Sequence, residues 1–83
     1  MPTPDQPGTR LEGASEATFK ALIGRKISVR YRLHDDPEHP SSEAVGMVAS
    51  VADGVVSVVN RRGEMSLFAI DDVIAGKAWP ISG

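Results

Sequence analysis

One short segment concentrates the side chains that can bind a metal ion or transfer a proton. Two histidines and three carboxylates lie within residues 34–39, namely His34, Asp35, Asp36, Glu38 and His39. This mixture matches the donor set of zinc or another divalent cation. Metal ligands must be held in place by neighbouring groups, however, and Pro37 and Pro40 leave the segment without an apolar anchor. We therefore expect a solvated loop that holds neither a metal nor a cofactor.

The serines that follow this loop do not complete a catalytic site. Ser41 and Ser42 are close to His39 in the sequence. A nucleophile also needs a base within hydrogen-bonding distance and a group that stabilises an oxyanion, and no motif supplies that group. The sequence therefore predicts no catalytic residue and favours a protein that is not an enzyme.

Basic side chains form the second candidate site. They occupy the outward positions of one predicted strand and the tip of one predicted turn: Arg25, Lys26, Arg30, Arg32, Arg61 and Arg62. Small barrels bind nucleic acid through such faces because the cations contact phosphates. The formal net charge of −2 and the scarcity of aromatic side chains for base stacking argue against this function. Nucleic-acid binding is therefore the alternative function, and Arg30 and Arg32 are the first residues to test.

The end of the chain offers a third candidate. Trp79 is the only tryptophan, and it follows Lys77 at the end of the last predicted strand. Large aromatic side chains contribute strongly to protein contacts, but more often they cover the core of their own chain. Trp79 and Lys77 are therefore candidate partner-binding residues, with packing of Trp79 over the open end of the fold as the other interpretation.

The elements that must position these residues are mostly short β-strands. Apolar residues alternate, or cluster between turn residues, in five segments: 26–33, 43–52, 55–60, 64–69 and 74–79. Such segments are typical of strands with at least one buried face. In the second segment the alternation places Val45, Met47, Ala49 and Val51 on the buried face, and Gly46 indicates a bend or a bulge.

The connections between these strands are also readable. Asp53 and Gly54 predict a two-residue hairpin turn in which both residues have positive φ. Gly63 suits the end of a second tight turn, and residues 70–73 suit a single helical turn. The two tight turns make the segments 43–52, 55–60 and 64–69 antiparallel neighbours in succession.

The N-terminal part contains no strand pattern. Residues 15–23 suit a short helix with Ser15 as its N-cap and Gly24 beyond its end. Residues 1–13 are predicted to be a disordered tail, and residues 14–83 to be one domain. The chain has no cysteine, no signal peptide pattern and no apolar run of about 18 residues, so we expect a cytoplasmic protein without membrane contact.

Four motifs resemble a known family. GRKISVRYRL at 24–33, VGMV at 45–48, NRRGE at 60–64 and DVIAGKAWP at 72–80 are similar to the SH3-like domain that precedes the catalytic domain in actinobacterial GNAT-family acetyltransferases. In that group the acetyl-CoA site is a glycine-rich loop followed by a helix in the GNAT domain. This chain has no such element. The resemblance therefore implies an accessory module that does not itself transfer acetyl groups.

Together these observations predict an all-β fold, a small five-stranded SH3-like barrel with a short N-terminal helix. The expected function is a non-catalytic binding or accessory module whose partner is a protein, either an acetyltransferase domain or a second copy of the chain. The alternative remains a small nucleic-acid-binding barrel that uses the basic face of its first strand.

Overall fold

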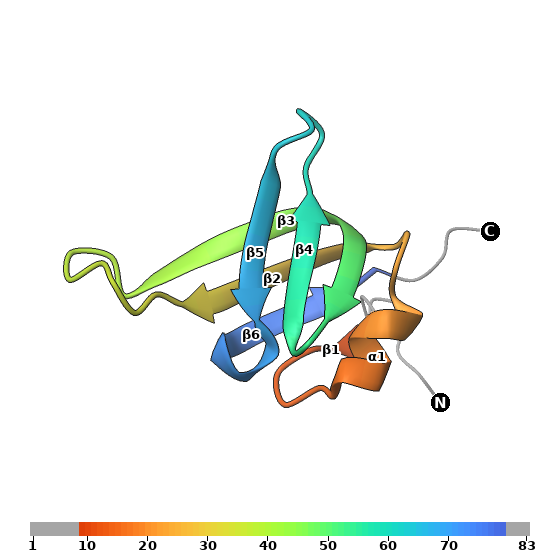
Figure 1. The fold of residues 1–83 in the computed structure, drawn as a ribbon, viewed down its shortest axis with the longest axis horizontal. Helices are drawn as coiled ribbons and strands as arrows, with labels where there is room; N and C mark the ends of the chain where they lie inside the picture. The colour runs from red at the N-terminus through yellow and green to blue at the C-terminus, as the bar shows by residue number, and fades with distance from the viewer. Residues whose placement is uncertain (1–8, 80–83) are drawn as a thin grey trace, which may run out of the picture.

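The computed structural model of the 83-residue chain describes residues 9–79. The elements in chain order are β1 (Thr9–Arg10), α1 (Glu16–Ala21), β2 (Lys26–Arg32), β3 (Ser41–Ala52), β4 (Val55–Val59), β5 (Met65–Ala69), a 3₁₀ turn (Ile70–Asp72) and β6 (Val73–Ala78). The strands form one antiparallel sheet of six strands in the order β1-β6-β2-β3-β4-β5. The sheet bends around its core, and the β4–β5 hairpin stands across the long β2–β3 pair (Figure 1).

The predicted fold class is confirmed: five antiparallel strands lie where the alternation placed them, and one short helix precedes them. Ser15 caps α1 as predicted, since its hydroxyl accepts a hydrogen bond from the Thr18 amide. Asp53 and Gly54 have φ of 53° and 76°, as the predicted hairpin turn requires. Within the described residues no helix is long and apolar enough to cross a membrane.

The prediction of a disordered tail over residues 1–13 is wrong for its last part. Thr9 and Arg10 form β1, which pairs with β6, and the Leu11 side chain is completely buried. The rest of the tail, residues 1–8, lies outside the described residues. Pattern analysis missed β1 because a two-residue strand shows no periodicity, and it exists only because β6 offers an unpaired edge.

The buried face predicted for β3 is wrong over most of the strand. Ala44, Val48 and Val51 point into the core, whereas Val45 and Met47 are 45% and 52% exposed. The register with β4 shifts between Val48 and Ser50, so Ala49 is an extra, bulged residue. Counting back from Val51 in steps of two therefore selects the wrong face before the bulge, because one added residue reverses the alternation.

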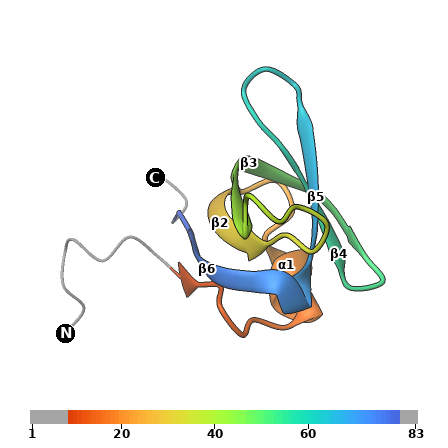
Figure 2. The same ribbon diagram turned by 90° about the vertical axis from the view of Figure 1, so that its left-hand side faces the viewer.

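One apolar core connects the helix to the sheet. The Phe19 ring of α1 meets Phe68 of β5 edge-on at 6.1 Å, and Tyr31 of β2 stacks on the same ring at 5.2 Å. Figure 2 shows β2 and β5 together with α1 around this interior. Because Phe68 contacts both α1 and β2, the hairpin, the helix and the long strand pair share a single core.

Candidate functional site

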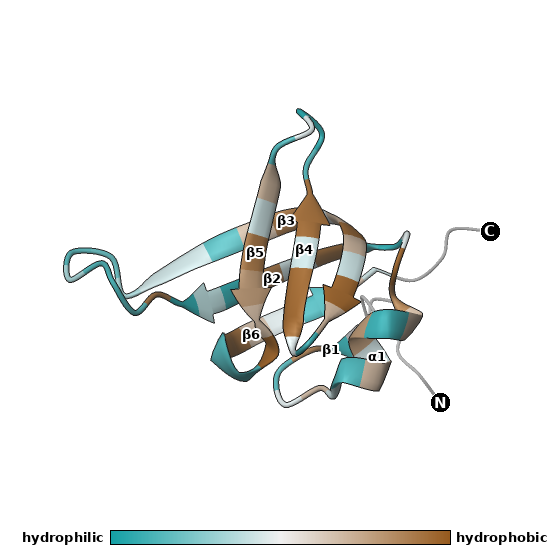
Figure 3. Cartoon of the chain, viewed as in Figure 1, coloured by the Kyte–Doolittle hydropathy of each residue, from teal (hydrophilic) through white to brown (hydrophobic). Residues whose placement is uncertain are grey.

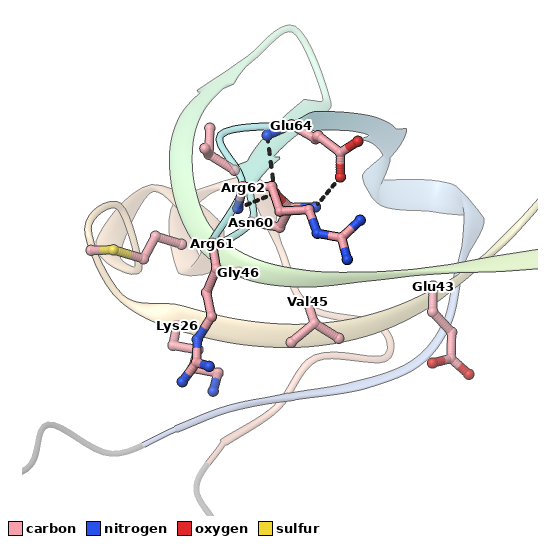
Figure 4. Close-up of a pocket in the computed structure, with 10 residues that line it drawn as sticks. Lys26, Glu43, Val45, Gly46, Asn60, Arg61, Arg62 and Glu64 are labelled. Carbon is pink, nitrogen blue, oxygen red and sulfur yellow. Dashed lines mark hydrogen bonds between the residues drawn. The ribbon is translucent and has the colours of Figure 1, made fainter.

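A groove lies between the first half of β3 and the turn that joins β4 to β5. Its volume is about 730 Å³. The groove is lined by side chains of three kinds, namely cations, carboxylates and apolar groups, together with Gly46 and Asn60: Lys26, Glu43, Val45, Gly46, Met47, Val59, Asn60, Arg61, Arg62 and Glu64. Figure 4 shows the turn above and β3 below, with their side chains around the space between them.

The β3 side of the groove follows from the bulge at Ala49. Because the bulge reverses the alternation, Val45 and Met47 face outward and form an apolar wall. Between them, Gly46 lies so close to β4 that a Cβ atom would overlap the Val59 carbonyl group. A residue without a side chain is therefore required there for the end of β4 to approach β3.

The turn side of the groove is held by Asn60. Its side-chain oxygen accepts hydrogen bonds from the amides of Arg62 and Glu64 at 2.9 Å and 3.0 Å, and its side-chain amide donates to the Glu64 carboxylate at 2.9 Å. Gly63 has φ of 81° and closes the turn. This network fixes the backbone that presents Arg61 and Arg62 at the tip (Figure 4).

The charge that the groove offers to a ligand is positive. Glu43 is paired with Arg30 at 2.5 Å, and Glu64 is bonded to Asn60. Among the residues that the structure describes, Lys26, Arg61 and Arg62 form no salt bridge. Three cations beside an apolar wall therefore remain available to a partner.

Trp79 lies next to the groove, because it contacts Lys26, one of the residues that line the groove. The Trp79 amide donates to the Lys26 carbonyl at 3.0 Å, and the ammonium groups of Lys26 and Lys77 lie 5.1 Å and 5.3 Å from the ring centroid. Arg25 also holds Trp79, since the Arg25 Nη2 donates a hydrogen bond to the Trp79 carbonyl at 2.6 Å. The half-buried ring thus has two lysines at cation–π distance.

The basic side chains that were predicted to form one candidate site lie in different places in the structure. Lys26, Arg61 and Arg62 come together in the groove, and Arg25 is used to hold Trp79. Arg30 is paired with Glu43, and Arg32 is exposed at the end of β2, outside the groove. The two sites that the sequence suggested, one basic and one around Trp79 and Lys77, meet at Lys26.

The apolar wall of the groove was missed by sequence reasoning. The alternation places Val45 and Met47 on a buried face, so the sequence does not indicate them as surface residues. The available signal was Gly46, which indicates a bend or a bulge in this strand, because a bulge reverses which residues face the core.

The loop with two histidines is arranged as separate pairs. His34 Nε2 lies 2.7 Å from Asp72, and His39 Nδ1 lies 3.1 Å from Asp36, which also accepts from the amides of Glu38 and His39. Over residues 9–79 no group of three or more His, Cys, Asp or Glu side chains is placed to hold a metal ion.

The fold agrees with one family model. The model for the Rv0428c N-terminal Sm-like domain, a small β-barrel-like domain, matches residues 21–77, which include all of β2 to β5 and most of β6. No curated protein and no solved structure matches the chain. Because the match covers well over half of the sequence, the chain belongs to the family of Rv0428c N-terminal Sm-like domains.

Proposed function

We propose that this chain is a non-catalytic binding module whose groove takes an extended protein segment carrying both acidic and apolar side chains. The observation that carries the proposal is the groove itself, where exposed Val45 and Met47 adjoin the cations Lys26, Arg61 and Arg62. Apolar contact supplies affinity, and the cations select a negatively charged partner and set its orientation.

A protein partner fits this surface better than a nucleic acid. The groove wall is aliphatic and offers no ring on which a base can stack. The Trp79 ring, which lies next to Lys26, already has Lys26 and Lys77 within cation–π distance.

The context that we propose is an acetyltransferase. The resemblance of four motifs to the SH3-like domain of GNAT-family enzymes points to this partner. The family description names an N-terminal domain, which agrees with a module that accompanies another domain. In this proposal Trp79 and Lys77 extend the contact from the groove toward the enzyme.

Nucleic-acid binding is the second candidate. It is favoured by the convergence of Lys26, Arg61 and Arg62 from two distant parts of the chain. If these three cations contact phosphates, the logarithm of the binding constant falls with the logarithm of salt concentration with a slope of about −2 to −3. Docking that depends mainly on apolar contact changes much less with salt.

The test is an NMR titration of the isotope-labelled chain. A GNAT acetyltransferase catalytic domain and a single-stranded RNA are added in separate experiments, each at low and at physiological salt. We expect the catalytic domain to shift the amide signals of Val45, Met47, Lys26 and Trp79 at both salt concentrations. We expect RNA to cause only weak shifts that disappear at physiological salt.

Matched variants locate the contact. Met47→Asp should weaken binding of the catalytic domain by more than about tenfold, because it places a charge on the apolar wall. Lys20→Ala, on the exposed face of α1, should leave the affinity unchanged. A different result would contradict the protein partner and favour a nucleic acid. In that result RNA binding is sensitive to salt and needs Arg61 and Arg62, and the catalytic domain causes no shifts.

A further inference from the structure

Among the residues that the structure describes, the sheet edge formed by β5 has none of the features that normally protect a strand edge. Its five residues, Met-Ser-Leu-Phe-Ala, include no charge and no proline, and its pairing with β4 has no bulge. The outward side chains Met65 and Leu67 are 60% and 61% exposed. Figure 3 shows this strand free of strongly hydrophilic residues, with a hydrophilic turn before it and a 3₁₀ segment after it that ends in hydrophilic residues. Exposed, regular and uncharged edges invite pairing with another strand.

The hydrogen bonds next to β5 show which backbone groups are free. Asn60 N donates to Glu64 O at 3.0 Å, and Ile70 N donates to Gly54 O at 2.8 Å. Bonded pairs alternate along an antiparallel ladder, so Ser66 and Phe68 direct their backbone groups toward β4. The N–H and C=O groups of Met65, Leu67 and Ala69 consequently point to the open edge.

The opposite edge of the sheet is covered. Its last strand is β1, which has only two residues and which shields the end of β6. Arg10 adds an exposed charge there. Over residues 9–79 the sheet therefore has one edge suited to pairing, and a contact that uses the same surface on both partners closes after two copies.

We propose that two copies of this chain associate through antiparallel pairing of their β5 strands. A two-fold axis at Leu67 places Leu67 opposite the same residue of the second copy and places Met65 opposite Ala69. All three residues offer the backbone groups that such a pairing needs. The exposed outer faces of the two strands then form one continuous apolar surface.

Charge at the two ends of β5 selects this arrangement. The basic turn, Arg61 and Arg62, precedes the strand, and the acidic turn, Asp71 and Asp72, follows it. Antiparallel pairing brings the basic turn of each copy to the acidic turn of the other. Parallel pairing would place like charges together at both ends, which is unfavourable.

The first measurement combines sedimentation velocity with amide hydrogen exchange over a range of chain concentrations. We expect a monomer–dimer equilibrium in which the Met65, Leu67 and Ala69 amides become protected as the dimer forms. The Ser66 and Phe68 amides should be protected at every concentration, because they bond to β4. A monomer at all concentrations, or a dimer without this alternating pattern, would overturn the proposal.

Variants at Leu67 provide the second measurement. Leu67→Lys sets two like charges opposite each other, and Leu67→Pro removes an amide that faces only the open edge. Both should raise the dissociation constant by more than about tenfold while circular dichroism shows an intact fold. Ile74→Lys makes the same change at an exposed position of β6 and should leave the dissociation constant unchanged. Dimers that persist in both folded Leu67 variants would contradict pairing through β5.

Discussion

Gly46 is the residue on which the shape of the groove depends. It lies between the two outward side chains of the apolar wall, and it leaves room for the Val59 carbonyl group. Neighbouring strands approach this closely only where one of them carries no side chain. The turn with Arg61 and Arg62 can therefore face β3, and the apolar and basic parts of the groove become adjacent.

Adding a methyl group at this position should disturb both stability and the groove. We expect Gly46→Ala to lower the free energy of unfolding by about 1–3 kcal/mol, because the end of β4 must move away from β3. Urea unfolding measures the change, and NMR shifts at Val59 and Asn60 show its location. Ala52→Val, at an exposed position of the same strand, should change stability by less than about 0.5 kcal/mol. Equal effects of the two variants would show that the close approach is unimportant.

Among the elements, the short N-terminal strand contributes more than its length suggests. The Leu11 amide donates to Gly76 O at 2.9 Å, and the Leu11 side chain enters the core directly after β1. A second link joins α1 to the β3–β4 hairpin, since Glu16 accepts a hydrogen bond from the Gly54 amide at 2.5 Å. The segment before β2 therefore closes the open side of the sheet and belongs to the domain.

Removing the Leu11 side chain tests this role. Leu11→Ala should lower the free energy of unfolding by about 2–5 kcal/mol, as for other fully buried leucines. Glu12→Ala changes the exposed neighbour and should have an effect below about 0.5 kcal/mol. Urea unfolding measures both free energies. If Leu11→Ala lowers the free energy of unfolding as little as Glu12→Ala does, β1 is not needed for the fold.

In the whole molecule, Phe68 joins parts that are far apart in the sequence. Its ring contacts Phe19 of α1 and Tyr31 of β2, and among the described strands β5 itself pairs only with β4. Since the helix, the long strand pair and the hairpin share this ring, we expect them to unfold together.

The single tryptophan makes this cooperativity measurable. Trp79 fluorescence reports on the end of β6, and far-ultraviolet circular dichroism reports on the sheet and helix as a whole. We expect both signals to give one coincident transition in urea. Phe68→Ala should lower the free energy of unfolding by about 3–5 kcal/mol and shift both transitions equally. Two separate transitions would show that the hairpin forms a unit of its own.

The fold was largely predictable because its determinants are local. Alternating residues in β2, Asp53 and Gly54 in one turn, Gly63 in another and Ser15 before α1 each favour their conformation through their immediate neighbours. The basic side chains could also be named from the sequence. The exposure of all of them except the half-buried Arg25 follows from their charge.

The candidate site, by contrast, was decided by the tertiary structure. The bulge at Ala49 exists through pairing with β4, and it turned Val45 and Met47 from expected core residues into the wall of a groove. Lys26 and Arg61 lie in one groove although 34 residues separate them in the sequence. Residue types and spacing determined the strands and turns. Strand register, which depends on contacts between distant segments, determined which side chains meet.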